Sequence, residues 1–155
     1  MSTDSPLQGF GHSHAHLGEL TRELSRLLSD EGGADPSAQQ KIAALASELR
    51  HELLEHFANE EEGLFPLIRR HFPGQGRAVD QLQAAHDVIC GTLVRFSFLA
   101  EREGELSSDA RLAFARFEAA YGNHSRAEAE LLDEFSRVLT PEQQTELEAL
   151  LRDLS

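Results

Sequence analysis

Two pairs of a histidine and a glutamate four residues apart could form a metal site in this chain. The first pair is His56 and Glu60, and the second is His124 and Glu128. Residues four apart on a helix lie on the same face, with Cβ atoms about 5 to 6 Å apart. Each pair therefore offers one imidazole and one carboxylate to the same point. Two such points that face each other inside a helical bundle predict a site for two metal ions.

The two pairs belong to an internal repeat that adds one more histidine to each half. His14 precedes the first pair and His86 precedes the second, and aligning these two histidines also aligns the apolar residues that follow them. Histidine nitrogen and carboxylate oxygen suit iron, manganese or zinc. One carboxylate from each half can bridge two cations about 3.5 to 4 Å apart. The repeat thus predicts a dinuclear site with open coordination positions.

The hydrophobic pattern indicates the helices that must position these side chains. Apolar residues recur at helical spacing, β-branched residues are sparse, and glycine and proline cluster at a few places. Because short links join long helices, we expect an all-α fold, namely an up-and-down antiparallel four-helix bundle with a short C-terminal helix. The predicted helices cover about 13–29, 37–70, 77–103 and 109–138, followed by a short one over about 141–153.

Local signals place some of the predicted boundaries and the interior. Ser37 and Gln40 form a candidate capping box, Pro66 is expected to kink its helix, and Thr140 and Gln143 are expected to cap the last helix. The hydrophobic side chains expected inside are Leu17, Leu20, Leu24, Leu28, Ile42, Leu45, Leu49, Leu53, Phe65, Ile68, Leu82, Ile89, Leu93, Phe96, Leu112, Phe114, Phe117, Tyr121 and Leu131.

Length and charge limit the class of protein. The 155 residues predict a single domain over 1–155, with a flexible N-terminal arm over 1–11 and a bundle over about 12–138. With 14 basic and 27 acidic side chains, the net charge of −13 disfavours binding to nucleic acid or to an anionic membrane surface. The sequence shows neither a signal peptide nor a membrane span, and its single cysteine cannot form an internal disulfide. We therefore expect a cytoplasmic protein.

The run that begins at His56, written His-Phe-x2-Glu-Glu-x2-Leu-Phe-Pro, resembles the hemerythrin-like proteins, also called the HHE cation-binding domain. The resemblance extends from His14 to about Leu132. It implies a left-handed four-helix bundle around a non-haem di-iron centre that serves oxygen binding, sensing, or the handling of nitric oxide, peroxide and iron. The implied cofactor is two iron ions, Fe2+ or Fe3+, with a bridging oxo or hydroxo group. The implied ligands are His14, His56, His86 and His124 as terminal ligands and Glu60 and Glu128 as bridges.

The sequence leaves an alternative open at two of the possible ligand positions. Oxygen-carrying hemerythrins have a fifth histidine where this chain has Cys90, so that either one iron keeps an additional open position or the thiolate coordinates. The first option disfavours reversible oxygen carriage. In the first helix, His14 and His16 both lie at the edge of the apolar stripe. The repeat favours His14, because aligning His16 with His86 would set charged residues against apolar ones.

Three further side chains are expected to border the site without binding metal. Phe57 and Phe117 are expected in the core, where they would also keep the site dry and narrow. Tyr121 lies one turn before His124, so its hydroxyl is expected to donate a hydrogen bond either to a bound oxygen ligand or to a carbonyl. Glu61 and Glu62 are expected on a solvated face, with Glu61 at most supporting a ligand.

Three functions follow from these features. The leading hypothesis is a di-iron protein that binds dioxygen or a related small oxidant, together with an unidentified redox or signalling partner. The second is iron-dependent scavenging of peroxide or nitric oxide, or donation of iron, which leaves open whether the protein is an enzyme. The third is a non-redox interaction module that a metal stabilises.

Overall fold

The computed structural model describes residues 6–29, 36–102 and 106–153. Within these ranges the chain is almost entirely helical and has no strand, which confirms the expected all-α class. The helices in chain order are α1 (Pro6–Ser29), α2 (Pro36–Asn59), the π-helix η2 (Glu60–Leu64), α3 (Phe65–His71), the 3-10 helix η3 (Pro73–Gln75), α4 (Gly76–Ala100), α5 (Ser108–Ser136) and α6 (Pro141–Asp153).

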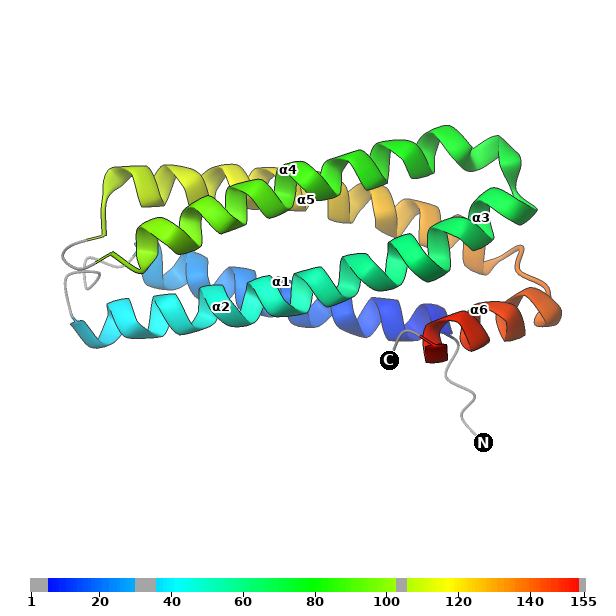
Figure 1. Ribbon diagram of the computed structural model, residues 1–155, viewed down its shortest axis with the longest axis horizontal. Coiled ribbons are helices and arrows are strands. Elements are labelled where there is room, and N and C mark those ends of the chain that lie inside the picture. The colour runs from blue at the N-terminus through cyan, green and yellow to red at the C-terminus, as the bar shows by residue number, and fades with distance from the viewer. Residues whose placement is uncertain (1–5, 30–35, 103–105, 154–155) are drawn as a thin grey trace.

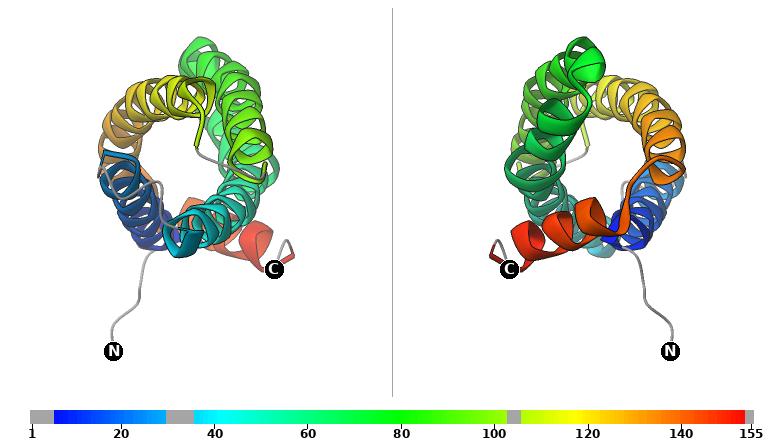
Figure 2. Two further views of the ribbon diagram at one scale, coloured as in Figure 1. Left: turned by 90° about the vertical axis from the view of Figure 1, so that its left-hand side faces the viewer. Right: turned by 90° about the vertical axis from the view of Figure 1, so that its right-hand side faces the viewer.

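The long helices lie lengthwise beside one another as a helical bundle (Figure 1). Helix α1 packs against α2 and α5, and α4 packs against the same two helices. Viewed along the bundle, the helices surround a shared interior (Figure 2). Helix α6 closes one end of the bundle, where it contacts α1 and η2. None of the described helices is long and apolar enough to cross a membrane.

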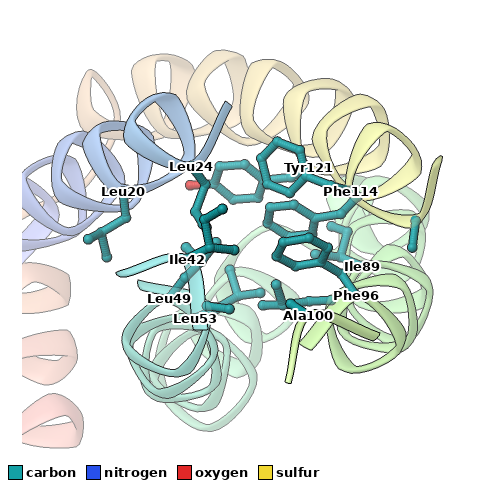
Figure 3. Close-up of a cluster of buried hydrophobic side chains, with 14 of the residues drawn as sticks. Leu20, Leu24, Ile42, Leu49, Leu53, Ile89, Phe96, Ala100, Phe114 and Tyr121 are labelled. Atoms are coloured by element: carbon teal, nitrogen blue, oxygen red, sulfur yellow. The ribbon is translucent and has the colours of Figure 1, made fainter. Parts of the chain in front are cut away.

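Buried hydrophobic side chains form two clusters along the bundle. The first includes Leu24, Leu49 and Phe96, which point into the interior from α1, α2 and α4 (Figure 3). The second joins η2, α3, α4 and α5 to α6, through side chains such as Phe65 and Leu147. Buried polar residues separate the two clusters along the chain: His86 on α4, His124 and Glu128 on α5, and Glu60 between α2 and α3. The candidate site is thus enclosed between two apolar clusters.

Two predicted helix starts differ from the structure. Helix α1 begins at Pro6, so residues 6–11 of the predicted flexible arm are helical, while residues 1–5 lie outside the described part of the chain. Helix α2 begins at Pro36, so Ser37 lies within the first turn and is not the N-cap. Proline is favoured at a first helical position because its missing N–H has no partner there and its φ angle is already helical. The prolines therefore mark both starts.

A π-helical turn lies where the sequence predicted a proline kink. The backbone N–H of Phe65 donates to the carbonyl of Glu60, five residues back, and α3 continues with Pro66 in its first turn. Proline has no N–H to donate, so one bond of the ladder must be lost at this point. π-turns of this kind are frequent at functional sites. Here the turn begins at a predicted metal ligand, Glu60.

The C-terminal helix begins as predicted. The backbone N–H of Thr140 donates to the Gln143 side chain over 2.9 Å, and the N–H of Gln143 donates to the Thr140 hydroxyl over 3.2 Å. This reciprocal pair is a capping box. One core prediction on α5 is wrong, because Leu112 is 50 % exposed. The buried stripe of that turn runs through Ala110, Ala113 and Phe114, which turns Leu112 outward.

Candidate metal centre

Six polar side chains from four long helical segments meet in the bundle interior. Both glutamates are fully buried, and three of the histidine side chains are 1 to 3 % exposed, whereas that of His14 is 17 % exposed. The six residues are His14 on α1, His56 on α2, Glu60 at the start of η2, His86 on α4, and His124 and Glu128 on α5. Helix periodicity explains this convergence, because each residue occupies an inward position of its helix.

The first half of the site contains His14 and His56. The Nε2 atom of His14 lies 2.8 Å from Oε1 of Glu128 and 3.9 Å from Oε1 of Glu60. The Nε2 atom of His56 lies 2.5 Å from Oε1 of Glu60 and 3.5 Å from Oε1 of Glu128. Two histidine nitrogens and one oxygen of each carboxylate therefore share a small volume.

The second half repeats this arrangement with the other carboxylate oxygens. The Nε2 atom of His86 lies 2.9 Å from Oε2 of Glu60, and the Nε2 atom of His124 lies 2.8 Å from Oε2 of Glu128. Within each half, the four ligand atoms lie within 4.8 Å of one another. Each glutamate thus turns one oxygen to each half, as a carboxylate does when it bridges two cations.

Several of these buried atoms lack hydrogen-bond partners among the described residues. They include both oxygens of Glu60, Oε2 of Glu128, and Nε2 of His86 and His124. Leaving a buried ionic group unpaired is costly, on the order of several kcal/mol per ion. Cations between the nitrogens and oxygens would satisfy all of these atoms at once. The residues present therefore fit a pair of bound cations.

Electrostatics in the metal-free site favour an ionised Glu128 facing a protonated His14. Burial opposes ionisation of Glu128, but contacts with Glu60, His124, His14 and His56 outweigh it and hold the pKa of Glu128 well below its ordinary range. Burial alone would lower the pKa of His14, yet hydrogen bonding to Glu128 and Glu60 raises that pKa to about 9. Metal binding must displace such protons, because only the deprotonated nitrogen can act as a ligand.

A comparison with protein-family models identifies the family of this chain. The model of the hemerythrin HHE cation-binding domain matches residues 5–135, most of the chain. The chain belongs to this family. No protein of curated function and no solved structure matched it. The matched range includes all six residues of the candidate centre, and the family binds cations, so the centre is where this HHE domain would hold metal.

In this HHE domain His86 is the most closely supported of the six residues. Its ring stacks on Phe57, with centroids 3.6 Å apart and an interplanar angle of 9°, and it also lies 5.6 Å from the ring of Phe65. The Nδ1 atom of His86 lies 3.0 Å from Oε1 of Glu61. Glu61 is 38 % exposed, so it is neither buried nor simply solvated. No spacing in the sequence identifies this contact, because it depends on how α4 packs beside η2.

The aromatic residues predicted to border the centre are all buried. Phe57 contacts three histidines, since its ring centroid also lies 5.4 Å from that of His124 and 6.1 Å from that of His56. Phe117 lies farther along the core and stacks on Tyr121, 5.7 Å away. The hydroxyl of Tyr121 is buried without a hydrogen-bond partner among the described residues. Burial and the charges of the two glutamates raise the pKa of Tyr121 to about 12, so its hydroxyl keeps its proton at neutral pH.

The two alternative ligands lie outside the centre. His16 is 46 % exposed, and its Nε2 atom lies 3.8 Å from the exposed Glu48. Cys90 is a half-buried free cysteine that packs against the first hydrophobic cluster and joins neither group of ligand atoms. Burial, followed by the charges of Asp87 and Glu61, raises the pKa of the Cys90 thiol, which disfavours the thiolate that a metal would bind.

A groove of about 380 Å³ lies between α4 and α5 of the HHE domain. Most of its lining is small or aliphatic, including Ala85, Ala120 and Ala127, and His124 also contributes to it. Apolar side chains make no hydrogen bonds with water, so a small apolar molecule can bind in such a groove without breaking any. The groove therefore brings apolar surface next to the second half of the candidate centre.

Proposed function

We propose that this HHE domain is a non-haem di-iron protein that binds dioxygen or a related small oxidant. The observation that carries the proposal is that two histidine pairs share the same two buried glutamates, each through a different oxygen. The proposed ligands are His14, His56, His86 and His124, with Glu60 and Glu128 as bridges. Two iron ions bound there would supply open coordination positions and exchange of electrons between Fe2+ and Fe3+.

We further propose that the long helices form an up-and-down antiparallel four-helix bundle. The colours of Figure 1 support this, because each long helix starts near the end of the bundle at which the preceding one finishes. In this topology every helix contributes ligands at the same depth. A reducing cytoplasm, which we propose as the location, would keep Cys90 as a thiol.

Charge and enclosure support a small oxidant as the ligand. Two divalent cations facing two carboxylates would leave net positive charge, which favours an anionic product of oxygen reduction such as superoxide or peroxide. Phe57 and Phe65 exclude water from the His86 side of the centre. The unpartnered hydroxyl of Tyr121 retains its proton and is available as a hydrogen-bond donor within the interior.

The test is to load the full chain with Fe2+ under anaerobic conditions and then mix it with oxygenated buffer while the visible absorption is recorded. We expect a protein-specific absorption change that Glu60→Gln abolishes, because that substitution removes a bridging carboxylate. Free Fe2+ in the same buffer is the control. An oxygen reaction that matches free Fe2+ in rate and spectrum would contradict the proposal.

The partial exposure of His14 favours a second candidate, iron donation or the scavenging of peroxide or nitric oxide. At 17 % exposure, the side chain of His14 is more exposed to solvent than that of any other ligand in the proposed centre. Transfer of iron from the loaded protein to an external chelator tests donation, and peroxide consumption tests scavenging. Release in a single slow phase, together with peroxide consumption no faster than that of free Fe2+, would exclude this candidate.

A further inference from the structure

Two neighbouring side chains on one helical face restrain His86. Phe57 and Glu61 are four residues apart across the junction of α2 and η2. Phe57 fixes the plane of the imidazole by stacking at 3.6 Å, and Glu61 contacts Nδ1 at 3.0 Å. The opposite ring nitrogen, Nε2, is then directed toward Glu60, 2.9 Å away. The ring is held on both its face and its edge.

A carboxylate contact at Nδ1 has a specific chemical consequence. A neutral imidazole carries its proton on either Nδ1 or Nε2, and only the nitrogen without the proton can bind a metal. An ionised carboxylate can only accept hydrogen bonds, so Glu61 favours the tautomer with the proton on Nδ1. Nε2 of His86 is left free to face the centre. Carboxylate partners of this kind orient metal-binding histidines and increase their affinity.

Two other histidines of the centre have weaker support at Nδ1. For His14 the partner is the Ser125 hydroxyl at 3.3 Å, which can donate or accept and so does not select a tautomer. Nδ1 of His124 has no hydrogen-bond partner among the described residues. The carboxylate of Glu61 therefore restrains Nδ1 of His86 more strongly than the described contacts restrain Nδ1 of these two histidines.

We propose that Glu61 is a positioning residue that orients His86 for metal binding. This inference rests on the proposed metal centre and assigns Glu61 no contact with metal or oxidant. The π-turn contributes, because Glu61 lies within η2, next to the bridging Glu60, and reaches His86 from the same segment. One segment thus supplies both a bridge and the support for a terminal ligand.

The experiment is a titration of the metal-free full chain with Co2+, with visible absorption and a competing chelator reporting each binding step. We expect two steps in the wild type. In Glu61→Ala, we expect the binding step that uses His86 to weaken by about 10- to 100-fold while the other step stays unchanged. The melting temperature of the metal-free protein should not change. Glu61→Gln, which keeps an acceptor oxygen, should weaken the same step less.

Glu62→Ala is the matched control, because Glu62 is exposed on the same π-turn and carries the same charge. Equal weakening of both steps in Glu61→Ala, no weakening at all, or an equal effect of Glu62→Ala would overturn the inference. A wild type that binds two Co2+ ions with any of these results would overturn the role of Glu61 alone. A wild type that binds no Co2+ would overturn the proposed centre together with it.

Discussion

The two halves of the centre have the same ligand chemistry but different surroundings. The half with His86 and His124 is enclosed, with side chains 1 to 3 % exposed, an aromatic stack on His86 and a carboxylate at its Nδ1. The half with His14 is 17 % exposed at that residue, and its Nδ1 faces only a hydroxyl. The two halves of the internal repeat thus share the same kinds of ligand atom, while the side chains around these atoms differ.

The largest effect is expected from changing a shared carboxylate. Glu60→Gln and Glu128→Gln each neutralise a carboxylate that both halves share and leave it only one oxygen, so both halves should lose metal. Elemental analysis of the purified variants checks this, with Glu62→Gln as a control of equal charge. If either bridge variant lost metal from one half only, the glutamates would not be shared.

Substitutions of single histidines should separate the halves. His86→Ala and His14→Ala should each abolish one of the two binding steps, and not the same step, because the two histidines belong to different ligand groups. His16→Ala should change neither, because His16 is exposed and lies outside the ligand groups. Co2+ titration of the three variants checks these expectations. Unchanged binding in His14→Ala with a loss in His16→Ala would reverse the assignment on α1.

Removal of metal should lower stability, because metal bound only to the folded state stabilises it by mass action. At a free metal concentration about 100 times Kd, the gain is about 2.7 kcal/mol, which corresponds to a melting temperature higher by roughly 5 to 10 °C for a chain of this length. Calorimetry of loaded and chelator-treated protein measures the difference. Equal melting temperatures would show that the centre and the fold are not coupled.

The smallest effects are expected next to the centre. Tyr121→Phe removes a buried hydroxyl without a partner, so the free energy of unfolding should stay the same or rise by about 1 kcal/mol. Metal content should not change, and an altered oxygen reaction would assign the hydroxyl to the ligand. Urea unfolding and elemental analysis check both statements. A large loss of stability would instead indicate that the hydroxyl is satisfied in the folded state.

Cys90→Ala should also leave the metal content unchanged, because Cys90 packs against the hydrophobic cluster and joins neither ligand group. The variant separates a packing role from a ligand role. A loss of one metal ion in Cys90→Ala would restore the thiolate as a ligand and change the comparison between the halves.

The sequence was sufficient to predict the features that depend on helical periodicity. The spacing of His56 and Glu60, and the alignment of His14 with His86, predicted side chains that the structure brings together. The contact of Glu61 depends on how α4 packs beside η2, which no single-helix pattern contains. The exposure of Leu112 and the π-turn likewise depend on register and on the backbone around Pro66. That the converging residues bind iron stays a prediction.

The most direct test of the account is the iron content of the full chain, reconstituted anaerobically with excess Fe2+ and freed of unbound metal. The account predicts two irons per chain, and fewer in Glu60→Gln. A wild type that retains no iron, or one that retains the same amount as Glu60→Gln, would contradict a centre built on shared glutamates.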